Sequence, residues 1–189
     1  MNTIVTLGRC CVLKKGRKDV LRSLRLTEET SRELSDEAER QSVSFSALTT
    51  TVLTNYLEYG RYADRYGRLT FNPSTVTAIL NALSDETVAK LGKERGKARP
   101  KDMLASNGLN WSLGTTVQLV EKYLSKHTRW FDCTLREDQA GFHIHLSHRL
   151  NRKWSIFLAQ YVSSMFREFG FKPAEVTVSD YTLSLRLAR

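Results

Sequence analysis

The chain has 189 residues, of which 41% are hydrophobic, and a formal net charge of +9 at pH 7. This length fits one ordinary domain, or a small N-terminal module followed by a domain of about 100 residues. No stretch approaches the ~18 consecutive apolar residues of a membrane span, and the N-terminus lacks the apolar region of a signal peptide, so we expect a cytoplasmic protein without a membrane partner. The three cysteines, Cys10, Cys11 and Cys133, have no metal-binding spacing, which favours reduced thiols.

Positive charge is concentrated near the N-terminus. Residues 1–27 carry seven Lys or Arg side chains against the single Asp19, a net charge of +6, whereas residues 28–41 contain six acidic side chains and two arginines. Such a basic segment indicates a polyanionic partner such as nucleic acid. Residues 1–18 show no clean hydrophobic period, and we expect them to form a flexible basic arm.

The next segment, residues 19–60, predicts a strand followed by two helices. Alternating residues from Val20 to Leu26 place Leu24 and Leu26 on one face of an extended chain, and Leu21, Ser23 and Arg25 on the other. Thr27 can then cap a helix that runs to about Gln41, with Glu28 and Glu29 where the helix dipole favours carboxylates.

Ser44 can cap a second helix over about 45–59, which carries a broad apolar stripe. One short strand and two short helices cannot make a core alone. The strand therefore needs a partner from a second copy of the chain, and we expect a homodimer.

A resemblance to the ribbon-helix-helix superfamily of MetJ, Arc and CopG-type regulators covers Leu21–Leu57, whose sequence is LRSLRLTEETSRELSDEAERQSVSFSALTTTVLTNYL. The strand, the capped acidic helix, the short loop and the Ser-x-Ser opening of the second helix occur in the family's order. Ser42 stands where the family commonly has a small residue, often Gly. The resemblance implies a homodimer that inserts a two-stranded ribbon into the major groove of DNA.

The outward residues of that ribbon, Leu21, Ser23 and Arg25, would face the bases, and Arg25 could contact guanine through two hydrogen bonds. The resemblance implies the same positions. Phosphate contacts would come from Lys18, from Arg22 and from the free amides of Ser44, Phe45 and Ser46 at the start of the second helix. The alternative is that the arginines are solvated surface charges and that Ser44 is a simple helix cap.

Residues 61–73 predict a linker, and Ser74 and Ser84 look like caps for helices at about 75–83 and 85–95. A break at Gly96–Pro100 is expected before further helices near 101–106 and 113–126. A second basic run could extend phosphate contacts or form a solvated helix face; it comprises Lys90, Lys93, Arg95, Lys97, Arg99 and Lys101.

From Thr128 the period changes to two, which predicts a hairpin that turns at Gln139-Ala140. Lys153–Gly170 predicts an amphipathic helix, and the end of the chain alternates again, with a phase change at Ser179-Asp180. The fold class is therefore α+β, with residues 74–189 forming central helices and a C-terminal ββαβ or ββαββ domain for ligand sensing or oligomerisation.

Three histidines, His143, His145 and His148, fall within six residues. An H-x-H pair on a strand shares one face and can chelate zinc, nickel or copper, whereas His148 has the other parity. The run FHIHLSH resembles a segment of the NikR nickel regulators, but the Cys that completes their site is missing and the helices at 75–126 are foreign to them. The alternative, which we favour, has the histidines in ordinary hydrogen bonds of a sheet or interface, with no cofactor.

These features predict a sequence-specific transcriptional regulator, such as a repressor, whose partners are double-stranded DNA, a second copy of the chain and a small-molecule effector. An antitoxin-like protein that regulates its own operon is the alternative. An RNA-binding domain would need an aromatic and glycine signature that the strands lack. Enzyme activity is not expected, because we find no glycine-rich phosphate loop, CxxC pair or recognisable Ser, His and acid motif.

Overall fold

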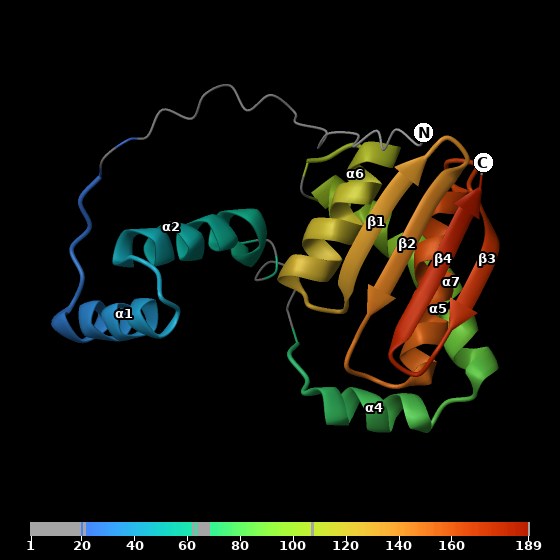
Figure 1. Cartoon of the computed structure of the whole chain (residues 1–189), viewed down its shortest axis with the longest axis horizontal. Helices are drawn as coiled ribbons and strands as arrows, with labels where there is room; N and C mark the ends of the chain where they lie inside the picture. Colours follow the sequence, from blue (N-terminus) through green and yellow to red (C-terminus); the bar gives the residue numbers. More distant parts are fainter. Residues whose placement is uncertain (1–19, 21, 62, 64–68, 107, 189) are drawn as a thin grey trace, which may run out of the picture. The chain divides into compact units, whose positions relative to one another are not determined.

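The computed structural model describes residue 20 and residues 22–61, 63, 69–106 and 108–188 (Figure 1). The chain forms two compact units, Met1–Thr50 and Thr51–Arg189, and the boundary falls inside helix α2. Among the described residues, none of the helices combines the length and the apolar character that crossing a lipid bilayer requires.

Two N-terminal helices confirm the helical part of the predicted module. α1 (Glu28–Arg40) begins at Thr27, whose Oγ1 accepts a hydrogen bond from the Thr30 amide at 3.2 Å. α2 (Phe45–Asn55) begins after Ser44, whose Oγ accepts one from the Ala47 amide at 3.1 Å, and it continues into the π-helical turn η1 (Tyr56–Gly60). The predicted strand is not formed: Val20 and 22–26 have no regular secondary structure, since no described segment of the chain pairs with them.

The loop between α1 and α2 turns at Ser42. The Ser42 amide donates to the Glu39 carbonyl at 2.9 Å and the Val43 amide to the Ala38 carbonyl at 3.0 Å, the pattern that ends many helices with a left-handed residue. Ser42 has that conformation, with φ of 53°. Ser42 thus stands at a loop position whose geometry favours glycine.

The central helices differ from the predicted ones at two places. α4 (Pro73–Asn81) is capped by Asn72, not by Ser74, because the Asn72 carboxamide oxygen accepts from the Thr75 amide at 2.8 Å while Pro73 takes the first helical position. The predicted linker therefore ends at residue 72. Ser84 caps α5 (Asp85–Ser106) as expected, through a 3.2 Å bond from the Thr87 amide.

The predicted break at Gly96–Pro100 is wrong, because α5 runs through it without interruption. A Cβ atom added at Gly96 would lie 2.3 Å from the Tyr161 carbonyl oxygen on α7 (Arg152–Arg167), and one at Gly92 would lie 2.4 Å from that of Phe157. These glycines permit a close helix contact and do not end the helix. Pro100 is tolerated inside the helix, where it is buried.

The helix predicted at 113–126 is present as two consecutive pieces. α6 (Leu113–Gln118) starts at Ser112, and η2 (Leu119–His127) continues it with π-helical bonding. The Trp130 amide donates back to the Leu124 carbonyl at 3.0 Å, so the chain turns sharply after the helix, and Arg129 takes a left-handed conformation with φ of 52°.

A four-stranded antiparallel sheet completes the unit and selects ββαββ from the two predicted arrangements. Its strands are β1 (Asp132–Asp138), β2 (Gly141–Ser147), β3 (Lys172–Val178) and β4 (Thr182–Ala188), in the order β1-β2-β4-β3. Both predicted turns are confirmed. β3 is an edge strand that contains Pro173 and a register shift between Pro173 and Glu175.

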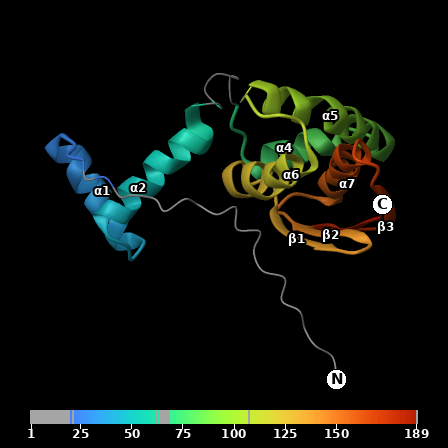
Figure 2. The ribbon, with the colours of Figure 1, turned by 90° about the horizontal axis from the view of Figure 1, so that it is seen from above.

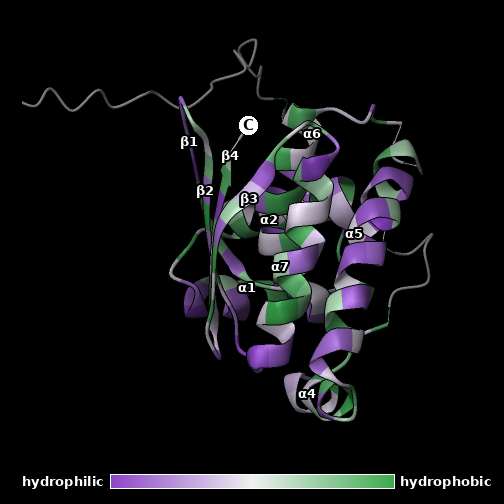
Figure 3. Cartoon of the chain, turned by 90° about the vertical axis from the view of Figure 1, so that its right-hand side faces the viewer, coloured by the Kyte–Doolittle hydropathy of each residue, from purple (hydrophilic) through white to green (hydrophobic). Residues whose placement is uncertain are grey.

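The C-terminal unit has three layers, in which α7 lies between the sheet and α5 (Figures 2 and 3). The inner face of the sheet contributes alternate buried residues, including Phe142, Ile144, Leu146, Leu183, Leu185 and Leu187, to the core around α7. This arrangement confirms the α+β fold class. It also leaves the other face of the sheet, with exposed His143 and His145, without a covering helix among the described residues.

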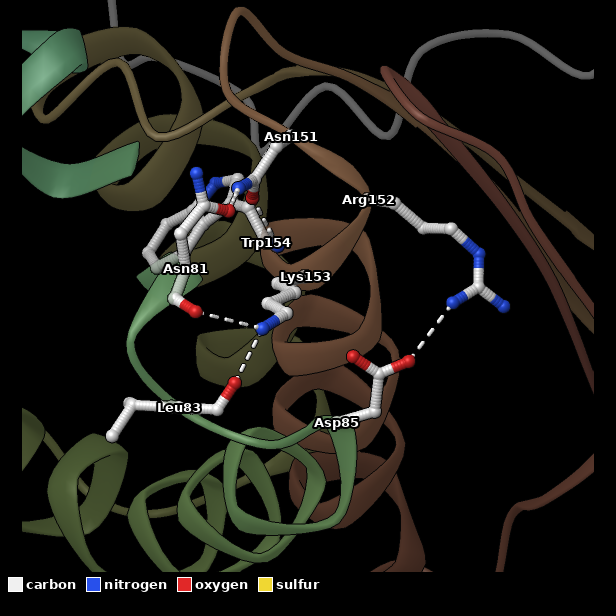
Figure 4. A network of polar contacts seen from close by, with 7 residues as sticks. All are labelled: Asn81, Leu83, Asp85, Asn151, Arg152, Lys153 and Trp154. Carbon is white, nitrogen blue, oxygen red and sulfur yellow. Dashed lines mark hydrogen bonds and ion pairs between the residues drawn. The ribbon is translucent and has the colours of Figure 1, made fainter. Parts of the chain in front are cut away.

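Polar contacts fix the corner between α4 and α5 against the start of α7 (Figure 4). The Lys153 ammonium donates to the carbonyls of Asn81 and Leu83, and Arg152 pairs with Asp85 at 3.0 Å. Asn151 caps α7 through a 3.3 Å bond from the Trp154 amide and donates to Asn81. These contacts hold the first turn of α7, and Trp154 with it, in a defined position.

Candidate functional site

The basic segment before α1 is exposed. Arg22, Ser23 and Arg25 lie in a solvent-exposed segment without regular secondary structure that leads directly to the Thr27 cap. Neither arginine has an ion-pair partner among the described residues. Leu21 and Lys18, the other expected DNA contacts of this segment, lie outside the described residues. Two arginines are thus available to bind an anion. The segment that carries them has backbone groups that can pair with a strand of another chain.

The start of α2 leaves amide donors exposed. Ser44, Phe45 and Ser46 are solvent-exposed, and the Ser44 side chain caps the Ala47 amide. The first amides of a helix have no intrahelical acceptor, so this end retains donors that can bind an anion beside the cap. The two interpretations of Ser44, cap and anion site, are therefore compatible.

The two N-terminal helices bury few side chains. Ala38 is the buried residue of α1, and Leu48 is that of α2. Large apolar side chains are instead exposed in the preceding segment, in α2 and in η1: Leu24 (61% exposed), Leu26, Val52 (49%), Leu53 (50%), Tyr56 (54%) and Leu57 (54%). We call these six residues the exposed apolar set. Val52, Leu53, Tyr56 and Leu57 follow one another along one continuous helix, and exposed apolar side chains gathered in this way favour contact with another chain.

The second basic run lies on α5. Five of its side chains, Lys90, Lys93, Arg95, Lys97 and Arg99, are exposed. Lys101 pairs with Glu168 on the chain after α7 at 2.6 Å and lies 5.7 Å from the centroid of the Trp111 ring. Lys101 therefore has a structural role, and the other five side chains extend into solvent.

His143 and His145 share the open face of the sheet, as their spacing predicts. His143 Nε2 lies 2.9 Å from a carboxylate oxygen of Asp138, and His145 Nδ1 lies 2.9 Å from the Ser184 hydroxyl on β4. The other Asp138 oxygen accepts from the amides of Ala140 and Gly141 in the hairpin turn, and these bonds lower the pKa of that carboxyl. The contact between His143 and Asp138 thus links β2 to the hairpin turn.

His148 lies apart from His143 and His145, as the parity of the strand predicts, so the three side chains do not form one ligand set. It follows the end of β2 and is buried; its Nδ1 accepts from the Leu150 amide at 3.3 Å, so Nε2 carries the proton and donates to the Ser155 hydroxyl at 2.7 Å. Burial lowers the pKa of His148. Among the described residues, no group of three or more His, Cys, Asp or Glu side chains could hold a metal ion.

Cys133 is a free thiol on β1. Its partial burial raises its pKa to about 12, so the group is a neutral, weakly reactive thiol at neutral pH. Cys10 and Cys11 lie outside the described residues.

A cavity of about 830 Å³ was not predicted from the sequence. It lies within the C-terminal unit. Its lining residues come from η1, from the segment that leads into α4, from the turn after η2 and from the start of α7. Its walls include Tyr59, Phe71, His127, Arg129, Trp130, His148, Arg149 and Trp154. These residues come from four segments that are far apart in the chain, and only the density of aromatic residues could have indicated the cavity.

Aromatic contacts organise this cavity. The Trp154 ring meets that of Trp130 edge-on at 5.3 Å, and its indole nitrogen donates to the Trp130 carbonyl at 3.2 Å. Tyr59 stacks on His127 with centroids 5.4 Å apart, and Glu58 lies 3.6 Å from His127. Burial lowers the pKa of His127, aided by the neighbouring Lys126.

Comparison of the chain with family models, with curated proteins and with solved structures finds no match.

Proposed function

We propose that the protein is a homodimeric, sequence-specific DNA-binding regulator. The observation that carries this proposal is the combination, within residues 22–57, of a basic exposed segment and a capped helix pair whose apolar side chains remain exposed. Neither feature alone indicates DNA binding. Together they match what a ribbon-helix-helix module needs: a surface for a second copy, and a positively charged strand for DNA.

Dimerisation follows from the exposed apolar set. Burial of apolar surface stabilises proteins by roughly 25 cal/mol per Å², and α1 and α2 gain little of this within one chain. In a two-fold dimer, the segments around Leu24 would pair as antiparallel strands, and α2 would pack against its copy. The segment 22–26 would then acquire the strand partner that it lacks among the described residues.

DNA recognition follows from the alternation of that strand. When Leu24 and Leu26 face the helices, Ser23 and Arg25 face outward into the major groove. Arg25 would donate two hydrogen bonds to guanine. Arg22 and the exposed amides at the start of α2 would bind phosphates and set the register of the ribbon, as such contacts do in other complexes.

The test begins with selection of a preferred duplex from a random pool, followed by titration of full-length protein with that duplex and with scrambled DNA. Arg25→Ala should weaken binding to the selected duplex by about 1–3 kcal/mol and leave binding to scrambled DNA almost unchanged. Arg95→Ala, which removes an exposed charge from α5, is the matched control and should leave both affinities nearly unchanged.

Equal losses on both duplexes would make Arg25 a phosphate contact. Failure of the selection to enrich any sequence would contradict the proposed function itself.

A further inference from the structure

The cavity in the C-terminal unit has the size and composition of a small-molecule site. Its volume of about 830 Å³ falls in the range of ligand pockets, about 300–1,000 Å³. Flat apolar surface comes from Trp130, Trp154, Tyr59 and Phe71. Polar and charged residues are as frequent in the wall as apolar ones, and they include the hydroxyl-bearing Thr70 and Ser125.

The cavity wall carries an excess of positive charge. Lys126, Arg129 and Arg149 line it, and Asp132 is the acidic residue among its lining side chains. The two imidazoles of the wall, His127 and His148, add hydrogen-bonding groups without adding charge near neutral pH, since burial lowers the pKa of each. The electrostatic environment therefore favours an anion.

Arg129 is held in an unusual backbone conformation at this wall. Its φ of 52° lies in the left-handed region, which is unfavourable for a non-glycine residue. The bonds from the Arg129 amide to the Ser125 carbonyl and from the Trp130 amide to the Leu124 carbonyl impose that turn. Arg129 and Trp130, which follow one another at this turn, both line the cavity.

We propose that this cavity binds a planar organic anion, an aromatic ring that bears a carboxylate or a phosphate. The ring would lie among the four aromatic side chains, and the anionic group would meet Arg129 and Arg149. The second step of the proposal is that this ligand regulates DNA binding. This step rests on the function proposed above.

The second step has a structural basis in Tyr59. This residue lines the cavity, stacks on His127 and meets Tyr123 edge-on at 5.1 Å. It also belongs to η1, which continues α2 without a break. A ligand that packs against Tyr59 changes the stability of the helical turn that ends α2, and α2 carries part of the proposed dimer surface.

The binding test uses indole-3-acetate, titrated into the full chain by calorimetry. Phenyl phosphate is the second anionic probe; indole, which has no charge, and cyclohexylacetate, which has no aromatic ring, are the comparison compounds. Both anionic aromatic probes, or one of them, should bind, and each comparison compound should bind at least about tenfold more weakly than the anionic probe that binds. The better probe decides between a carboxylate and a phosphate ligand.

Three variants locate the site. Arg129→Asn, which suits the left-handed conformation, and Arg149→Gln should each weaken the binding of that probe by about tenfold. Arg136→Gln removes an exposed charge from the open face of the sheet, outside this cavity, and should leave it unchanged. Thermal unfolding of each variant checks that the fold is retained.

Absence of binding by either anionic aromatic probe, or equal binding by all three variants, would overturn the ligand site whatever the protein does with DNA. Binding that follows the expected pattern, but leaves the affinity for the selected duplex unchanged, would overturn only the effector role. A chain that binds the probe but selects no DNA sequence would keep the site and reject the proposed function.

Discussion

His148 sits in a buried position that tolerates only its neutral form. Its Nδ1 accepts from the Leu150 amide, and a proton there would remove that bond and leave a charge in the interior beside Ser155. Because burial lowers its pKa in the folded chain, the unfolded chain binds the proton more readily. The stability contributed by His148 is therefore complete above its unfolded pKa of ~6.5 and is lost as the pH falls from there toward the folded pKa.

We accordingly expect the midpoint of urea unfolding to decrease between pH 7.5 and pH 5, and the decrease to become smaller in His148→Gln. His127, whose pKa is lowered in the same direction, should account for part of the remainder. His145→Gln is the matched control, because this ring is exposed on the open face of the sheet, and its decrease should equal that of the parent chain. An unchanged pH dependence in His148→Gln would show that its burial is not coupled to stability.

The histidines also show what residue-scale patterns can predict. Strand alternation alone places His143 and His145 on one face and His148 apart from them. Their hydrogen-bond partners could not be predicted, because Ser184 meets His145 only through the pairing of β2 with β4, which are 39 residues apart at these positions. Ligand sets assembled from one short run of sequence miss such distant partners.

The contact between α5 and α7 depends on the absence of side chains at two turns of α5. Gly96→Ala would place a Cβ atom 2.3 Å from the Tyr161 carbonyl oxygen, which belongs to backbone and cannot move aside. We expect a loss of about 1–3 kcal/mol in the free energy of unfolding, although alanine is the better helix former. Chemical denaturation measures this loss.

Gly114→Ala is the control for helix propensity, since a Cβ atom at this position in α6 meets nothing within 4 Å. It should leave stability unchanged or raise it slightly. If Gly96→Ala also raised stability, the two helices would be less closely packed than the structure shows.

At the scale of elements, helix caps could be predicted from neighbouring residues, whereas the effects of contacts between distant segments could not. Thr27, Ser44 and Ser84 cap the helices that they predict, because capping involves residues within one turn. Gly96 and Pro100 suggested a helix end that does not exist, because the close approach of α7 is a tertiary contact. The sequence does not identify Asn72 as a helix cap, because the predicted linker extends over Pro73, which is the first residue of α4.

For the whole molecule, the dimer proposal makes a strong prediction. Leu24→Pro removes a backbone amide from the segment that would pair with its copy, so both dimerisation and DNA binding should be lost. Analytical ultracentrifugation should show the parent chain as a dimer and the variant as a monomer. Leu69→Pro, which makes the same change in another exposed segment without regular structure, should remain a dimer. A monomeric parent chain would contradict the N-terminal dimer.

The α+β class and the helix pair could be predicted from periodicity and turn residues, and the ββαββ order was one of two arrangements that these signals allowed. The three-layer packing could not, because the basic sequence of α5 gives little indication that a helix layer covers α7 on the side opposite the sheet. The aromatic cavity was missed for the same reason: Tyr59, Trp130 and Trp154 become neighbours only when the layers are in place.

The two edge strands of the sheet, β1 and β3, affect how readily the protein aggregates at high concentration. An unprotected edge strand offers amide and carbonyl groups to other chains and can seed amyloid-like growth. β3 interrupts that row with Pro173, which has no amide hydrogen, and with the register shift beside it, while β1 ends in the charged run Arg136, Glu137 and Asp138. The sheet is therefore a poor template for fibrils, and the proposed dimer would confine self-association to the N-terminal segment, where it can be symmetric and closed.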